Sequence, residues 1–166
     1  ELRTEIGFLF QGSALYDSMS VRENLEFPLR RHTKKFGIIE DTTPLVMEAL
    51  ESVGLAHAID LMPNELSGGM KRRIALARTL ILKPKIILYD EPTTGLDPIT
   101  SKEIVLLMNS VQKKYNPSSI IITHDVDCAK VIANRMILLI DGVNYIEGTF
   151  SELSSSSDPK VQAFFK

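Results

Sequence analysis

The feature that most constrains the fold of this chain is an alternation of short apolar runs with helical stretches. The β-rich runs cover residues 5–10, 85–89, 119–123 and 135–140. Each run is apolar at successive positions, which is typical of strands buried on both faces of a parallel sheet. Strand followed by helix, several times over, predicts an α/β fold with a parallel sheet.

Local capping signals predict where the helices begin. Residues 20–23 form a capping box, with Ser first and Glu last. Thr43 followed by Pro44 indicates an N-cap and a first helical position, for a helix that runs on to Gly54. The Asp-Pro pairs at 97–98 and 158–159 repeat this arrangement.

Two segments depart from the strand–helix rhythm. From about Gly12 to about Pro63 there is no convincing strand, so we expect a helical insertion on one side of the sheet. The serine run at 154–157 predicts a short flexible linker before a last amphipathic helix.

Composition narrows the class of protein. Nineteen Lys and Arg against 21 Asp and Glu give a net charge of −2, which argues against a nucleic-acid-coating protein. Cys128 is the only cysteine, so no internal disulfide can form and we expect a reducing compartment. No apolar run is long enough to span a bilayer, and no signal peptide is visible. Because the chain opens with Glu-Leu-Arg-Thr rather than Met, we expect a piece of a longer protein.

The strongest chemical feature is an apolar run at residues 86–89 that ends in Asp90 and Glu91. Ligands of open parallel sheets bind at the carboxyl ends of the strands, where this pair falls. One acid could hold Mg²⁺ through water while the other polarises an attacking water. An isolated Asp-Glu pair is as often a plain exposed strand end.

A second candidate site lies at residues 66–70, which read Leu-Ser-Gly-Gly-Met before a helix that runs through Leu82. Ser67 can cap free backbone N–H groups, and Gly68 and Gly69 let a ligand approach the backbone. Helix N-termini attract anions, so a phosphate site is plausible. A capped helix after a loop explains the same residues.

Three further polar residues are weaker candidates. His124 follows one predicted strand and could bind a phosphate or a water, and Asp125 after it would cap the next helix. Gln11 ends the first strand and could reach a metal-bound water. Asp97 is explained as the N-cap of the helix that Pro98 opens.

In this order and spacing, these residues resemble the ATPase subunits of ABC transporters from residue 5 to about 148. Gln11 resembles the Q-loop, residues 66–70 the signature motif, and residues 86–91 the Walker B strand with its catalytic Glu. Residues 95–97 resemble the D-loop and His124 the switch histidine. The resemblance implies one partial nucleotide-binding domain. Its expected parts are a P-loop NTPase (RecA-like) core at 1–11 and 83–153, a helical signature-bearing subdomain at 12–82, and a linker with a C-terminal helix at 154–166.

The resemblance also implies a head-to-tail dimer with a second ATPase subunit, which sandwiches two ATP molecules. Asp90 would hold Mg²⁺ through water, Glu91 would act as general base, and His124 would contact the γ-phosphate. Gln11 would sense the metal and the nucleotide. Across the dimer, the partner's ATP would meet the signature residues and the D-loop, which here are Ser67, Gly68, Gly69 and Asp97.

The sequence departs from the family pattern in two ways. The phosphate-binding G-x-x-x-x-G-K-[ST] is absent from these 166 residues, and no Lys follows a Gly. We therefore expect the P-loop to lie upstream of Glu1 and the chain taken alone to be inactive. Met70 stands where most relatives carry Gln.

Residues 9–24 and 61–73, with 97–100 and 158–165, resemble the ATPase of MCE-type (Mla-like) phospholipid transporters. This resemblance implies a lipid cargo, a transmembrane permease partner, an MCE-domain lipid-binding protein as a further partner, and a peripheral location on the cytoplasmic face of the inner membrane. An amino-acid or metal-ion importer ATPase shares the core motifs. A soluble ABC ATPase and a non-catalytic interaction fragment are the alternatives outside transport.

Overall fold

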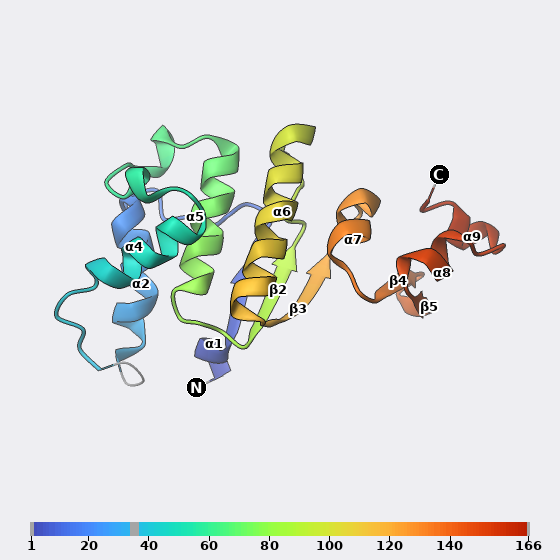
Figure 1. Ribbon diagram of the computed structural model, residues 1–166, viewed down its shortest axis with the longest axis horizontal. Coiled ribbons are helices and arrows are strands. Elements are labelled where there is room, and N and C mark those ends of the chain that lie inside the picture. The colour runs from blue at the N-terminus through green and yellow to red at the C-terminus, as the bar shows by residue number, and fades with distance from the viewer. Residues whose placement is uncertain (1, 34–36, 166) are drawn as a thin grey trace. The chain divides into compact units, whose positions relative to one another are not determined.

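A three-stranded parallel sheet in the order β1-β2-β3 organises the first part of the chain (Figure 1). The strands are β1 (Ile6–Leu9), β2 (Ile86–Asp90) and β3 (Ser118–Ile122). Ile86 pairs with Ile6 on one side and with Ser118 on the other. The predicted runs at 5–10, 85–89 and 119–123 are therefore parallel strands, within one or two residues at each end, and the α/β prediction is confirmed.

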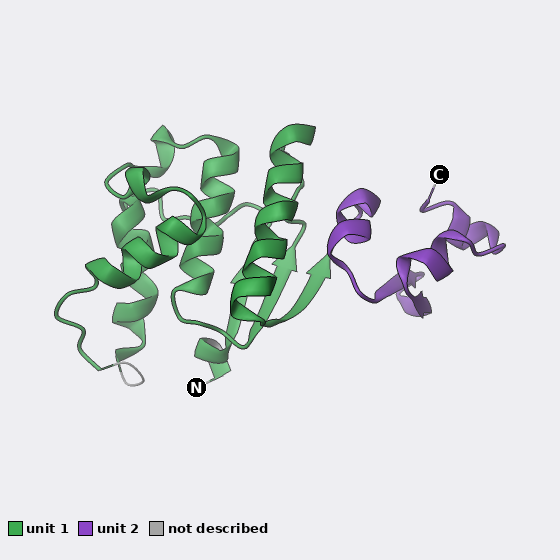
Figure 2. Cartoon of the chain, viewed as in Figure 1, with its two compact units in different colours: residues 1–122 green, residues 123–166 purple. Residues whose placement is uncertain are grey.

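The computed structural model describes residues 2–33 and 37–165. These residues form two compact units, Glu1–Ile122 and Thr123–Lys166 (Figure 2). Our predicted domain limits at residues 1 and 166, and positions 34–36 of the predicted helical subdomain, lie outside the described residues. The internal boundaries at 11, 82 and 153 remain predictions.

Among its described residues, the predicted helical insertion contains α2 (Val21–Arg31), α4 (Thr43–Ser52) and two short 3₁₀ turns, η1 (Ala56–Ala58) and η2 (Pro63–Glu65). The capping box at α2 is confirmed, since the Ser20 and Glu23 side chains each accept the other residue's backbone N–H. The predicted N-cap of α4 is wrong by one residue. Thr42 is the N-cap, because the carboxylate of Asp41 accepts the N–H of Thr43 and draws that residue into the first turn.

Two long helices, α5 (Gly68–Leu80) and α6 (Pro98–Tyr115), follow the insertion and lie on one side of the sheet (Figure 1). Helix α5 approaches β1 closely, since a Cβ at Gly7 would fall 2.5 Å from the Cγ2 atom of Thr79. The side chains of β1 and β2 on the sheet face toward α5 are buried, namely Leu9, Ile87 and Tyr89. A short helix α1 (Leu2–Glu5) precedes β1 and takes up Glu5, which we had expected to begin the strand.

The second unit contains α7 (Val126–Ile132), β4 (Met136–Ile140), β5 (Val143–Gly148), α8 (Phe150–Ser154) and α9 (Pro159–Gln162). Its core brings together Leu138, Leu153 and Val161. The Asp125 and Asp158 side chains cap α7 and α9 as predicted.

Two expectations about the second unit need correction. Residues 135–140 were expected in the parallel sheet, but β4 pairs with β5 in an antiparallel hairpin. The turn at Asp141-Gly142 has positive φ angles of 51° and 78°, which suit a tight hairpin. The serine run is also more ordered than a flexible linker, because Ser154 ends α8 and the Ser155 hydroxyl donates to the Ser151 carbonyl at 2.8 Å.

Within residues 2–33 and 37–165, no helix has the length and apolar character needed to cross a membrane.

Candidate functional site

The carboxyl ends of β1 and β2 carry the polar residues that the sequence singled out. Asp90 is the last residue of β2 and is half-buried, and Glu91 follows it directly. Gln11 lies two residues beyond the end of β1 and is exposed. Because neighbouring parallel strands end at the same edge of a sheet, these residues share the edge where ligands of such sheets bind.

Glu91 is held in an unusual conformation. Its φ angle of 46° lies in the left-handed region, which non-glycine residues rarely adopt. The backbone N–H of Glu91 donates to the carbonyl of Ile122 at 2.9 Å. The Thr94 hydroxyl donates to Oε2 of the Glu91 carboxylate at 3.0 Å. Both the backbone and the carboxylate of Glu91 are thus fixed by neighbouring groups.

The N-terminus of α5 is exposed to solvent, at the position where the sequence predicted a helix start that a ligand can approach. Ser67 is its N-cap, with Oγ accepting the N–H of Met70 at 3.2 Å, and both Ser67 and Gly68 are exposed. The glycines also have a packing role that we did not predict. A Cβ at Gly69 would fall 2.6 Å from the Cγ2 atom of Thr100, so glycine is needed there for α5 and α6 to approach closely.

Asp97 caps α6 as predicted. Its Oδ1 atom accepts the N–H groups of Ile99 and Thr100, both at 3.0 Å. The Thr100 hydroxyl, followed by these backbone N–H groups, holds the pKa of the Asp97 carboxyl below its usual value. The capping role accounts for the geometry of Asp97, and its contact with a nucleotide remains a prediction.

Sequence reasoning missed Arg72, a buried side chain of α5. Its Nη1 donates to the Phe10 carbonyl at 2.8 Å, and its Nη2 donates to the Thr94 carbonyl at 3.2 Å. Burial lowers the pKa of the Arg72 guanidinium, and the negative charge of Asp90 opposes that effect. A charged residue four positions before the buried Leu76, on one helical stripe, is the signal that could have revealed it.

Arg78 binds the loop after Gln11 in a similar way. Its Nη1 donates to the Ala14 carbonyl at 2.8 Å and its Nη2 to the Ser13 carbonyl at 3.1 Å. Ser13 and Ala14 both have positive φ angles, 63° and 49°. The guanidinium also lies 5.6 Å from the ring centre of Tyr16. Helix α5 therefore fixes this loop as well as the residues beside Gln11.

His124 belongs to the second unit, where it follows β3 and is exposed. Next to it, the Asp125 N–H donates to the Thr123 hydroxyl oxygen at 3.0 Å. The geometry described above therefore brings Gln11, Asp90 and Glu91 to one edge and Ser67 and Asp97 to two neighbouring helix starts. It does not include His124, whose role remains a prediction.

Metal binding was predicted at Asp90 and Gln11. In the described part of the chain, no three His, Cys, Asp or Glu side chains gather closely enough to hold a metal ion. One carboxylate and one amide oxygen suit Mg²⁺, which usually keeps several waters and binds through one or two carboxylates and substrate phosphates. The donor set therefore fits a magnesium ion held mainly by water and phosphate.

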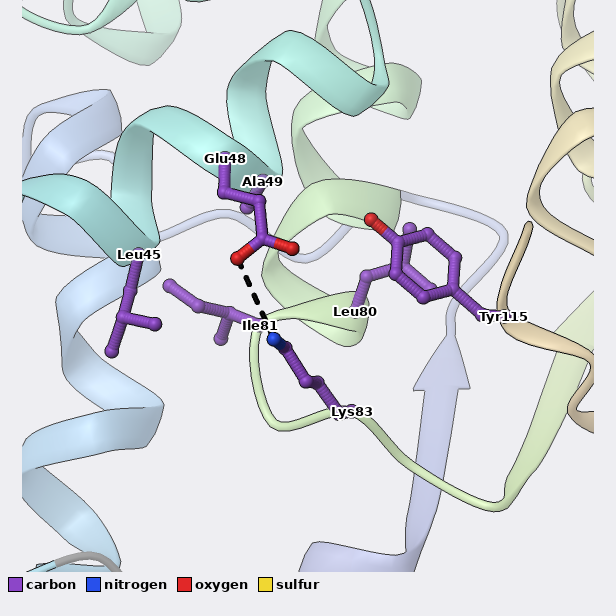
Figure 3. A pocket seen from close by; sticks show the side chains of 7 residues that line it. All are labelled: Leu45, Glu48, Ala49, Leu80, Ile81, Lys83 and Tyr115. Carbon is purple, nitrogen blue, oxygen red and sulfur yellow. Dashed lines mark hydrogen bonds and ion pairs between the residues drawn. The ribbon is translucent and has the colours of Figure 1, made fainter.

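A small hollow at the other end of α5 is distinct from this site (Figure 3). It is lined by side chains of α4, the α5 C-terminus and Tyr115, and the Lys83 Nζ atom lies 3.5 Å from the Glu48 carboxylate. None of the predicted site residues lines it. We assign no chemistry to it.

Comparisons with known proteins show which family of proteins this chain is similar to. The family model described as "ABC transporter" matches residues 1–94. The chain is 41% identical over 167 residues to the intermembrane phospholipid transport system ATP-binding protein MlaF of Haemophilus influenzae, covering all of this chain and 62% of that protein. It is 39% identical to the probable ribonucleotide transport ATP-binding protein mkl of Mycobacterium leprae, covering 99% of this chain and 47% of that one.

A solved structure has a similar fold. The ATP-binding cassette MJ0796, a dimer in a post-hydrolysis state bound to ADP and Pi, superposes with a TM-score of 0.76 at 33% identity. The match covers 88% of this chain and 63% of that one. This chain thus spans less than two thirds of the length of each of these relatives, and the predicted P-loop NTPase fold is confirmed over the part that it covers.

Proposed function

This chain belongs to the ABC transporter family, and from that premise we propose that the whole protein binds and hydrolyses ATP to drive a transporter. The observation that carries the proposal is the edge where β2 ends, with Asp90 in the strand and Glu91 fixed just beyond it by the Thr94 hydroxyl. A carboxylate held in place beside a second carboxylate can orient and deprotonate a water while the other holds a metal.

In this proposal each residue has one task. Asp90, assisted by Gln11, would hold Mg²⁺ through water, and the bound ion would supply charge neutralisation for the nucleotide's phosphates. Glu91 accepts the proton of the attacking water. His124 contacts the γ-phosphate. The exposed N-terminus of α5, with Ser67, Gly68 and Gly69, meets the phosphates bound by a second copy, and Asp97 lies beside it.

The proposed partners are supported by the exposed start of α5 and by the likeness to known ABC transporter ATPases. The exposed start of α5 suits a head-to-tail dimer of ATPase subunits, in which it would face a nucleotide bound by the second copy. We further propose a transmembrane permease as partner, a lipid-binding MCE protein as an additional component, and a peripheral location on the cytoplasmic face of the inner membrane. Phospholipid or another lipid is the proposed cargo, supported by the likeness to MlaF. Purification of the whole protein with its membrane partners, followed by lipid analysis, tests the cargo.

The test of the mechanism is Glu91→Gln in the whole protein. It preserves shape but removes the base, so phosphate release should fall by about 10²- to 10⁴-fold. ATP binding should persist, and dimers closed over ATP should accumulate in size-exclusion chromatography with Mg-ATP. The matched control is Glu51→Gln, the same change on the exposed surface of α4, which should leave the rate unchanged.

Two further variants separate the steps. Asp90→Asn should weaken Mg²⁺-dependent ATP binding itself, whereas Ser67→Arg should block dimer closure while each subunit still binds ATP. Hydrolysis by Glu91→Gln at the wild-type rate would exclude Glu91 as the base. We also propose that the 166 residues alone neither bind ATP tightly nor hydrolyse it, because they contain no P-loop pattern.

A further inference from the structure

We infer that Arg72 and Thr94 are positioning residues that hold Glu91 and the Gln11 loop in one fixed arrangement and tie both to the start of α5. The inference rests on the proposed ATPase function. Neither residue is within the motifs that predicted the site. Arg72 bonds carbonyls that lie 62 and 22 residues away in the sequence, whereas Thr94 bonds Glu91, three residues before it.

Thr94 acts on Glu91 directly. Its hydroxyl donates to the carboxylate at 3.0 Å, and its backbone N–H donates to the Glu91 carbonyl at 3.3 Å. Glu91 lies outside the strand in a left-handed conformation, so the sheet alone does not direct its side chain. The Thr94 hydroxyl therefore helps to set the direction of the carboxylate.

Arg72 holds the turn that contains Thr94. One nitrogen of its guanidinium binds the Thr94 carbonyl and the other binds the Phe10 carbonyl, one residue before Gln11. The planar guanidinium sets a fixed angle between its donors, so the two carbonyls are fixed relative to each other. Lys offers a single ammonium group without this geometry. Because Arg72 is buried, water cannot readily replace these bonds.

Arg72 also connects this arrangement to the proposed trans site. Arg72 lies on α5 five residues after the N-cap Ser67, or roughly 7.5 Å along the axis. On the other side, a Cβ at Gly69 would fall 2.6 Å from the Cγ2 atom of Thr100, so the start of α5 lies close against α6. A ligand that moves the start of α5 would therefore move Arg72, and with it the Thr94 turn and Glu91.

Steady-state kinetics of the whole protein test the inference. Thr94→Ala should lower kcat by about 10- to 100-fold, as expected for a misplaced catalytic group. KM for Mg-ATP should stay within about 2-fold, since the loss concerns the reaction rather than binding. Thr94→Ser keeps the hydroxyl and should restore most of the rate. A purely structural role would not give this rescue.

Arg72→Lys should likewise lower kcat more than it changes KM. Its matched control is Arg73→Lys on the next position of α5, where the side chain binds Glu103 at 2.6 Å and the Val53 carbonyl, away from the site. Arg72 is buried and its variant could lose stability, so half-exposed Thr94 provides the decisive comparison. Wild-type kcat in Thr94→Ala, or equal loss in Thr94→Ser, would overturn the inference and leave the proposed function standing. Absence of Mg-ATP hydrolysis by the wild-type protein would overturn both.

Discussion

The two faces of the three-stranded sheet carry similar apolar side chains but differ in burial. On one face, Leu9, Ile87 and Tyr89 are 1%, 0% and 3% exposed. On the other, Phe8 is 41% exposed, and Ile120 and Ile122 are 60% and 64% exposed. Because the strand repeat is two residues, neighbours in the sequence, such as Phe8 and Leu9, lie on opposite faces.

This difference shows what an apolar strand sequence reports and what it does not. The runs predicted strands buried on both faces, and the strands are present as predicted. Only the face toward α5 and α6 is buried among the described residues. Apolar character therefore indicates that both faces are suited to burial, whereas the covering elements decide which face is buried.

The largest expected contrast between the faces is in stability. Ile87→Ala removes a fully buried side chain and should lower the free energy of unfolding by about 2 to 5 kcal/mol. Ile120→Ala, on the neighbouring strand but on the exposed face, should cost less than about 1 kcal/mol. Urea unfolding followed by circular dichroism measures both. Equal losses would mean that the faces are buried to the same extent in solution.

The buried face should also make the protein sensitive to alkaline pH. Burial raises the pKa of Tyr89 from 10.0 to about 12, although a hydrogen bond with Ser119 acts in the opposite direction. The pKa of Tyr89 is higher in the folded state than in the unfolded state. The contribution of the neutral Tyr89 side chain to the free energy of unfolding is therefore complete below pH 10 and is lost as the pH rises toward 12. A shift of this size corresponds to about 2 to 3 kcal/mol.

Tyr89→Phe removes the titrating group. The stability difference between the wild type and Tyr89→Phe should therefore move in favour of the variant across this pH range. Unfolding curves at pH 9, 10 and 11 measure this stability difference, with each protein compared with itself at neutral pH. A difference that does not depend on pH would show that Tyr89 is solvated in the folded chain.

The smallest expected effect on stability concerns the exposed face. Phe8→Thr combined with Ile120→Thr should change the free energy of unfolding little, yet should reduce self-association of the 166-residue chain, because exposed apolar patches promote contact between copies. Sedimentation equilibrium measures the association. Leu106→Thr, at an equally exposed position on α6, is the control. If this control reduces association as strongly, the sheet face is not the surface responsible.

The parts of the fold that sequence predicted well depend on local interactions. Ser20, Ser67, Asp97, Asp125 and Asp158 cap the helices that their positions indicated, since a cap bonds N–H groups two or three residues away. The end of β2 at Asp90 was also predicted from a local signal, because the apolar run stops there. Strand β5 was missed although the Asp-Gly pair before it is a hairpin signal.

The residues of the candidate site likewise fall into those that a local pattern predicts and those that depend on partners distant in the sequence. Asp90 and Glu91 were found because they terminate a recognisable apolar run. Arg72 was not, because its partners, Phe10 and Thr94, lie 62 and 22 residues away and no local pattern specifies them. The packing role of Gly69 likewise depends on Thr100 of another helix.

The left-handed conformation of Glu91 has a consequence for the evolution and engineering of this chain. Glycine adopts such a backbone without the steric penalty of a side chain, which amounts to roughly 1 to 2 kcal/mol for other residues. Selection for stability alone would therefore favour Gly at this position. Procedures that optimise thermostability will therefore tend to replace the side chain that the proposed chemistry requires.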